Sequence, residues 1–221
     1  ALLAAAMPLL AQVHQSTTGD GADYVRMARD PGVFPEAPEA FRFLAPWLAS
    51  LLPGAATTAF IELTVVALAA TAALLFVWLR DLGTTPTAIW GVAAFLCSGA
   101  TVGAARNPYL VDPVAFAFAA AAFLLLWRGR YALLALCLGV GVLAKETVLV
   151  VAVAVAGVGY RTPRRVAALV AVPVVVYAAI HLTPLVYSYR GNHSYVRDIR
   201  GVFRYERTEV GVIRAPVQAI L

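Results

Sequence analysis

The chain has 221 residues, of which 62% are hydrophobic and only 13% are charged, and its mean hydropathy is +0.80. Soluble domains are roughly 45–50% apolar and about 25% charged, so this composition excludes an ordinary soluble domain. It predicts an all-α, polytopic integral membrane protein with about seven membrane helices. The net charge of +5 is then a signal of membrane topology, and no nucleic-acid partner is expected.

Apolar segments that alternate with polar connections set the expected chain order. They lie at about residues 1–13, 55–79, 86–104, 111–127, 131–144, 148–159 and 165–186. We expect one transmembrane domain, 1–221, with a first outer loop at 14–54 and a later one at 187–213. The chain opens inside an apolar run and closes on APVQAIL, which reads like the start of another helix, so we expect a fragment truncated at both ends.

The first outer loop carries more carboxylates than any other stretch of the chain. Its segment ADYVRMARD is predicted to form a short helix that ends at the following Pro-Gly, and STTGD offers N-cap residues. Helical spacing places Asp20, Tyr24 and Ala28 on one face. The next stretch, FRFLAPWLASLL, is amphipathic and aromatic, which suits a helix that lies in the membrane interface.

Two carboxylates belong to the middle spans. Glu62 lies seven residues into the second span, where it either lines a cavity or bonds to a neighbouring helix. Asp112 stands in VDPVAF at the head of a span and precedes Pro113, a residue favoured at the first helical position. Asp112 is therefore the N-cap of that helix, a side chain that faces a cavity, or both.

The thirty residues from Tyr131 to Tyr160 are almost wholly apolar, except for Lys145 and Glu146 in the middle. A single helix of this length would be about 45 Å long, too long for a bilayer core of about 30 Å without steep tilt. We therefore expect a hairpin of two short helices that turns at Lys145–Thr147.

The hairpin makes the distribution of arginine over the two sides of the membrane uneven. One side receives six arginines opposed only by Asp81, namely Arg80, Arg128, Arg130, Arg161, Arg164 and Arg165. The other side, the outer face, holds basic and acidic residues close to balance. An excess of arginine in short loops marks the cytoplasmic side, so Lys145 and the carboxylate-rich loop are expected at the outer face. Sixteen arginines against one lysine, with abundant Ala and Val, suggest a GC-rich bacterial genome and thus the bacterial plasma (inner) membrane.

Lys145 and Glu146 should lie below the outer surface, because the two arms of the hairpin are short. They either pair with each other or reach to headgroups, or Lys145 holds an anion under an outer cavity. The later outer loop, 187–213, is rich in Arg and Tyr and is either an anion-binding surface or a solvated loop that faces headgroups. No His, Cys and Asp spacing indicates a metal site, so no cofactor is expected.

These features together resemble the membrane module of the GT-C glycosyltransferases, a superfamily that includes aminoarabinose transferases and protein O-mannosyltransferases. Asp20, Tyr24 and Ala28 match the spacing of the family's acidic motif D-x-x-x-Y-x-x-x-A. Many members have Glu where this chain has Gly21, which leaves Asp23 as the alternative carboxylate. VDPVAF is similar to the Asp-Pro of a later span, GVGVLAKET to a Gly-rich helix that ends in Lys, and FRFLAPWL to an Arg-aromatic motif.

The resemblance, over roughly residues 14–160, implies transfer of a sugar from a polyprenyl-phosphate donor to an acceptor hydroxyl at the outer face. The acceptor is a glycan, a lipid or a protein. Asp20, or else Asp23, would be the general base. The implied substrate-binding residues are Tyr24 and Tyr109 for the sugar, Lys145, Arg42 and Arg106 for the leaving phosphate, Asp112, and Glu146 as the partner of Lys145. Some relatives use a divalent metal ion and others do not, so metal dependence stays open.

Two other classes of protein fit the same residues. A transporter or flippase would use Glu62, Asp112, Lys145 and Glu146 as a substrate or proton path, although the sequence shows no repeated halves. A non-catalytic membrane scaffold would use the charges only to lock helices together. Mutation of Asp20 would leave the scaffold's function intact and would abolish that of the transferase.

Overall fold

The structure, a computed structural model, describes residues 19–32, 41–158 and 163–182. These residues form helices and no strands, so the predicted all-α class is confirmed. The helices are α2 (Asp20–Arg29), α3 (Leu44–Ser50), α4 (Ala56–Leu82), α5 (Thr85–Leu96), α6 (Gly99–Arg106), α7 (Asp112–Trp127), α8 (Tyr131–Gly141), α9 (Val148–Val158) and α10 (Pro163–Leu182). The first apolar segment, 1–13, and the later outer loop, 187–213, lie outside the described residues.

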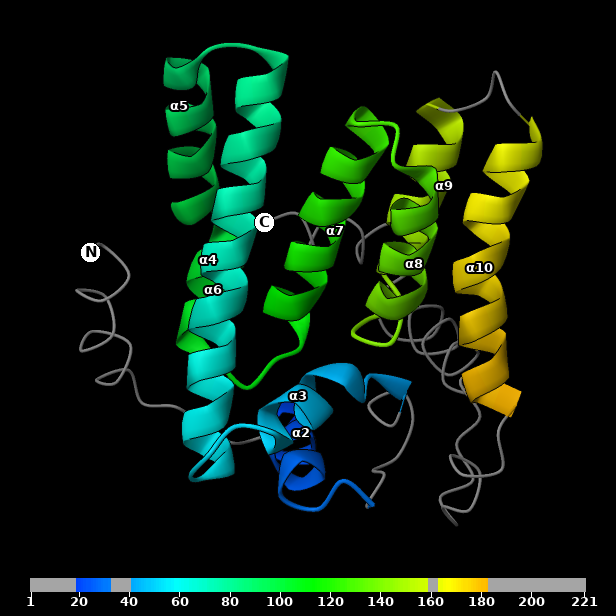
Figure 1. Cartoon of the computed structure of the whole chain (residues 1–221). Coiled ribbons are helices and arrows are strands. Elements are labelled where there is room, and N and C mark those ends of the chain that lie inside the picture. Colours follow the sequence, from blue (N-terminus) through cyan, green and yellow to red (C-terminus); the bar gives the residue numbers. More distant parts are fainter. Residues whose placement is uncertain (1–18, 33–40, 159–162, 183–221) are drawn as a thin grey trace, which may run out of the picture.

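The longer helices run roughly along one direction, whereas α2 and α3 lie across one end of them (Figure 1). The chain passes down and up between the two ends through α4, then the bent pair α5–α6, then α7. The bend of 47° between α5 and α6 falls at Cys97 and Ser98. Ser98 starts the new helix, because its side-chain oxygen accepts a hydrogen bond from the backbone N–H of Thr101 at 3.3 Å.

Helix length limits how many of these helices cross a membrane unaided. Within the described ranges, α4 is the one helix long and apolar enough, and the bent pair α5–α6 makes a second if it counts as one span. α7, with 16 residues, and α8, with 11, are apolar but shorter. At 1.5 Å per residue they measure about 24 Å and about 16 Å, less than a hydrocarbon core of about 30 Å. The expectation of about seven membrane helices is therefore not supported by the helix lengths.

The stretch from Tyr131 to residue 158 forms two helices and not one, as the length of the apolar run and the arginines at both ends predicted. α8 ends at Gly141 and α9 begins at Val148, and α9 returns beside α8 toward the end from which α8 started (Figure 1). Gly141 permits the close packing at this turn. A Cβ atom there would lie 2.9 Å from the Cβ of Phe118 on α7 and 3.1 Å from a methyl group of Val148.

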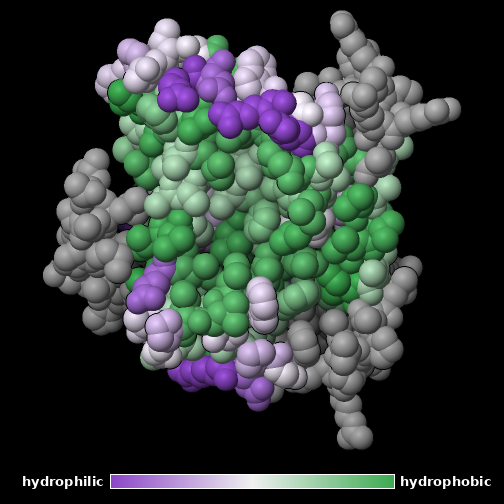
Figure 2. Space-filling model, in the orientation of Figure 1, coloured by the Kyte–Doolittle hydropathy of each residue, from purple (hydrophilic) through white to green (hydrophobic). Residues whose placement is uncertain are grey.

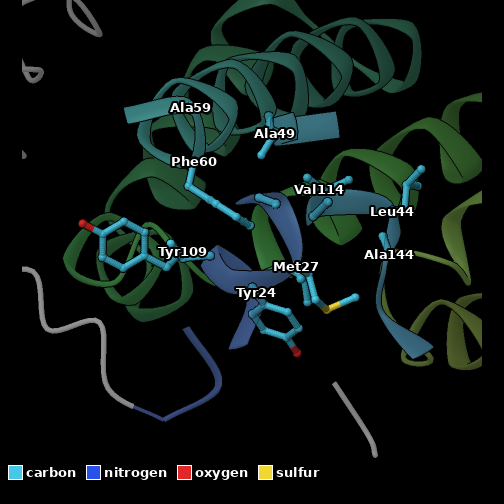
Figure 3. Packing of buried hydrophobic residues seen from close by; sticks show 14 residues of the cluster. Tyr24, Met27, Leu44, Ala49, Ala59, Phe60, Tyr109, Val114 and Ala144 are labelled. Atoms are coloured by element: carbon cyan, nitrogen blue, oxygen red, sulfur yellow. The ribbon is translucent and has the colours of Figure 1, made fainter. Parts of the chain in front are cut away.

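Two apolar clusters hold the helices together. The first joins α2 and α3 to the start of α4, the start of α7 and the turn after α8, through residues that include Tyr24, Met27, Leu44, Ala49, Ala59, Phe60, Tyr109, Val114 and Ala144. Figure 3 shows these side chains converging from their separate segments. The second joins α7, α8, α9 and α10 through Ala115, Ala122, Leu134, Leu138, Val148, Ala152 and Leu169. The first cluster fixes the α2–α3 layer over the end of the bundle.

The sides of the bundle remain strongly apolar. Figure 2 shows a broad hydrophobic band on the face in view, with hydrophilic residues gathered toward its two ends. Large side chains stand well out of the structure on several helices, such as Trp90 on α5, which is 75% exposed, and Val150 on α9. A soluble monomer rarely exposes so much contiguous apolar surface, so these sides are suited to contact with an apolar partner.

Candidate functional site

The end of the bundle that α2 and α3 cover gathers most of the residues that the sequence singled out. The starts of α4 and α7 and the turn between α8 and α9 all lie there (Figure 1). The end of α4, which carries Arg80 and Asp81, and the connection between α7 and α8, which carries Arg128 and Arg130, lie at the opposite end. The two groups of charges are thus separated as the expected topology requires.

Arg42 and Glu146 form a two-pronged ion pair at this site. The Nε atom of Arg42 donates to Oε2 of Glu146 at 2.8 Å, and its Nη2 atom donates to Oε1 of the same carboxylate. The remaining nitrogen, Nη1, donates to the hydroxyl of Tyr24 at 3.1 Å. The two charged side chains are 13% and 22% exposed. Such parallel charge-assisted bonds fix geometry strongly, so this pair ties α2 to the turn after α8.

Hydrogen bonding holds both members of this pair in their charged forms. Burial alone would raise the pKa of the Glu146 carboxyl, but the bonds from Arg42 outweigh burial and leave that pKa below its ordinary value. Burial alone would lower the pKa of Arg42, and the bonds to Glu146 and Tyr24 reverse that shift as well. The pair is consequently ionised at neutral pH.

Lys145 pairs with Asp112 and not with its neighbour Glu146. Its Nζ atom lies 2.6 Å from Oδ1 of Asp112, and the two side chains are 20% and 28% exposed. Asp112 is the first residue of α7. The N-cap of this helix is Val111, which makes no side-chain cap hydrogen bond. Asp112 is therefore not the N-cap of α7, and its ion pair with Lys145 was not predicted from the sequence.

A backbone bond anchors the turn that carries Lys145 and Glu146. The N–H of Leu44 donates to the carbonyl of Leu143 at 3.1 Å, which joins the start of α3 to residues 142–147. The turn is thus held from one side by the segment around Arg42 and from the other by the start of α7. Two adjacent residues of opposite charge consequently face different partners in a fixed arrangement.

The two candidate bases lie in the first turn of α2. Asp20 is the first residue of the helix and is exposed, whereas Asp23 is half-buried. Tyr24 and Ala28, which share the motif with Asp20, are buried in the first cluster. The carboxylates also suit the positive end of the helix dipole, which accounts for part of their presence there. The N-cap is Gly19 and makes no side-chain cap bond.

Gly21 lies in a tightly packed part of α2. A Cβ atom on Gly21 would lie 3.2 Å from the Cβ of Tyr109 and 3.5 Å from the side-chain oxygen of Asn107. The first turn of α2 therefore approaches the connection between α6 and α7 closely. A larger residue at position 21 would require Tyr109 to move by a few tenths of an ångström.

Three further residues named by the sequence do not join the two ion pairs. Tyr109 is 3% exposed and packs edge-on against Phe60, with ring centroids 6.4 Å apart, and burial raises the pKa of its hydroxyl. Arg106 is exposed in the last turn of α6. Glu62 is exposed on α4, so it does not line an interior path within the described structure.

Asn107 is a polar residue of this region that the sequence argument passed over. In the part of the chain that the structure describes, its side-chain oxygen is enclosed without a hydrogen-bond partner. The Asn-Pro dipeptide signals a turn, but burial of its side chain under α2 depends on tertiary packing. No group of three or more His, Cys, Asp or Glu side chains positioned to hold a metal ion occurs among the described residues.

The chain matches no protein-family model, no curated protein and no solved structure with which it was compared.

Proposed function

We propose that the protein is a bacterial membrane glycosyltransferase of the GT-C type. It transfers a sugar from a polyprenyl-phosphate donor to an acceptor hydroxyl at the outer face of the plasma membrane. The observation that carries the proposal is the position of Lys145, a half-buried cation with a partly exposed partner, at the end of the bundle covered by the carboxylates of α2. A cation and a carboxylate at one end are the two groups that such a transfer needs.

The apolar sides of the bundle support a membrane location. Trp47 on α3 and Trp127 at the end of α7 are both about half exposed, one toward each end of the hydrophobic band. Exposed tryptophans at both borders of an apolar band are typical of the two membrane interfaces. In this proposal α4 and the pair α5–α6 span fully, and the shorter helices cross within the bundle where the bilayer thins to meet them.

The proposed reaction is a displacement at the anomeric carbon of the sugar. The acceptor oxygen forms a bond to that carbon and gives its proton to Asp20, or to Asp23. The bond from the same carbon to the phosphate oxygen breaks, and the lipid phosphate leaves with the electron pair. Lys145 offsets the charge that develops on this phosphate. Because the donor carries a lipid tail, it reaches Lys145 from the side, through the apolar band.

The remaining residues of the site position these groups. Arg42 and Glu146 hold the turn that presents Lys145, and the Tyr24 hydroxyl links that turn to the helix that carries Asp20. Arg106, which is exposed at the end of α6, is a cation available for the donor phosphate. Tyr109 packs against the first turn of α2. Because metal dependence is open, the activity assay is run with and without a divalent metal ion.

Release of polyprenyl phosphate in proteoliposomes tests the proposal without knowledge of the acceptor. A panel of polyprenyl-phosphate sugars is offered with a mixed acceptor extract, with and without a divalent metal. We expect wild-type protein to consume one donor, and Asp20→Asn, or Asp23→Asn if that residue is the base, to slow release by about 100-fold or more. Asp30→Asn, an exposed carboxylate at the other end of α2, is the matched control and should keep full activity.

Two results would reject the proposal. One is that no donor of the panel is consumed, and the other is that both carboxylate variants keep full activity. The transporter hypothesis needs Glu62, Asp112, Lys145 and Glu146 to form one path, and the exposed position of Glu62 on α4 does not favour it. Movement of labelled lipid across the vesicle membrane without loss of its sugar would support the transporter instead.

A further inference from the structure

The two neighbouring ion pairs of the site differ in how firmly each holds its cation. Arg42 makes two hydrogen bonds to Glu146 and one to Tyr24. Within the described part of the chain, the ammonium group of Lys145 makes one hydrogen bond, to Asp112. An incoming anion would have to replace three bonds to free Arg42 but only one to free Lys145. Lys145 is therefore the exchangeable cation of the two.

Asp112 can give up Lys145 without leaving a deeply buried charge. Its side chain is 28% exposed, so water can replace the ammonium group. It also occupies the first position of α7, where the helix dipole favours a negative charge. An ammonium group offers three donors, but a phosphate placed beside Asp112 would meet a like charge. Asp112 and a phosphate thus compete for Lys145.

We propose that Asp112 is a built-in competitor, which occupies Lys145 while the site is empty and is displaced by the phosphate of the lipid donor. The ligand class is a phosphate monoester or diester on a polyprenyl tail. This inference rests on the proposed function for the choice of a lipid phosphate, and binding alone tests it.

The proposal predicts effects of opposite sign for the two members of one ion pair. Asp112→Asn keeps the shape of the side chain and removes its charge, so lipid phosphate should bind about two- to fivefold more tightly, the worth of a partly exposed ion pair. Lys145→Gln should weaken binding about tenfold or more, because a charged hydrogen bond to the ligand is lost. A pair with only a structural role would not produce a gain in either variant.

The binding assay uses purified protein in detergent and three probes, namely farnesyl phosphate, farnesol and inorganic phosphate. Affinity is measured by titration, and thermal stability with saturating probe gives a second readout. Asp81→Asn is the matched control, because Asp81 also pairs with a basic side chain but lies at the other end of the bundle. It should bind farnesyl phosphate like wild type. Asp112→Ser supplies the uncharged variant if Asp112→Asn does not fold.

Tighter binding of farnesyl phosphate by the Asp112 variant, weaker binding by Lys145→Gln and no response to farnesol would support the inference. Equal or weaker binding by both Asp112 variants would overturn it, as would a wild-type protein that binds no phosphate. A pattern seen equally with inorganic phosphate would overturn the assignment to a lipid ligand. If the Asp112 and Lys145 variants change binding of farnesyl phosphate in opposite directions but no sugar is transferred in vesicles, only the proposed transferase function is rejected. If sugar is transferred but Asp112→Asn does not change binding, only the proposed competition by Asp112 is rejected.

Discussion

The two ends of the helical bundle both carry ion pairs, but they use them differently. At one end Asp81, in the last turn of α4, pairs with Arg128, and their side chains are 24% and 47% exposed. At the other end, which α2 and α3 cover, the cations Arg42 and Lys145 are only 13% and 20% exposed in their pairs with Glu146 and Asp112. Water screens the first pair and can replace either of its members at little cost, whereas Arg42 and Glu146, the more enclosed of the other two pairs, depend on each other.

The comparison shows that burial, and not the presence of charge, distinguishes the candidate site. The arginine-rich end has the composition of an ordinary solvated face. The covered end has four charges joined to a tyrosine hydroxyl and to the backbone of a turn. Substitutions at the two ends should therefore change the free energy of unfolding by different amounts, and four measurements test this contrast.

The largest effect is expected from Arg42→Met. It leaves the Glu146 carboxylate half-buried without its partner, so the free energy of unfolding should fall by about 3 kcal/mol, the low end of the range for buried pairs. Denaturant titration in detergent measures the change. The double variant with Glu146→Leu should recover most of the loss, because no uncompensated charge then remains. If the double variant loses as much free energy of unfolding as the two single variants lose in total, the pairing is contradicted.

The next effect in size is expected at the turn between α8 and α9. Gly141→Ala would place a methyl group 2.9 Å from the Cβ of Phe118, so α7 and α8 must move apart at a cost of about 2 kcal/mol. Gly103→Ala on α6 is the control, since nothing lies within 4 Å of the added atom. That change should stabilise the protein by about 0.5–1 kcal/mol. Changes of the same sign in the two variants would refute the close packing.

A smaller effect is expected from acid. The pKa of Glu146 is lower in the folded protein than its ordinary value of 4.5, so the carboxylate stabilises the fold above that value. This contribution is lost as the pH falls below about 4.5 through the folded pKa. The loss should be less than that of Arg42→Met, because a protonated carboxyl still forms hydrogen bonds. The contribution of Glu146 is isolated by measuring the free energy of unfolding of wild type and of Glu146→Gln between pH 7 and 3. Parallel plots of this free energy against pH for the two proteins would contradict the prediction.

The smallest effect is expected at the arginine-rich end. Arg128→Met removes the exposed pair with Asp81, and the free energy of unfolding should change by less than about 1 kcal/mol. The same titration as for Arg42→Met measures it, so the two arginine variants form a matched comparison. A loss as large as that of Arg42→Met would remove the distinction between the two ends.

Helix type and the separation of charges followed from the sequence. The length of the apolar stretch 131–160 and the arginines that flank it predicted the break that separates α8 from α9. Arginine placement predicted which connections share an end. Helix type and the separation of charges depend on local composition and on the direction in which the chain runs, and both can be inferred from the order of residues.

The partners of the charged residues did not follow from the sequence. Lys145 pairs across 33 positions with Asp112, and Glu146 across 104 positions with Arg42, because α7 and the segment before α3 pack against one turn. The break inside the apolar run 86–104 was not predicted either, since Ser98 starts a new helix in the middle of that run. Such features are set by tertiary contacts, which a hydropathy pattern does not contain.

The close approach of Gly21 to Tyr109 limits how this region can diverge. The atom nearest to a side chain at position 21 is the Cβ of Tyr109, so such a side chain is accommodated only if the backbone at residue 109 retreats or if residue 109 is a glycine. Homologues with a larger residue at position 21 should therefore have glycine at position 109 or a wider separation between α2 and the α6–α7 connection. An evolutionary comparison can thus detect the packing of α2 against the α6–α7 connection without any biochemical assay.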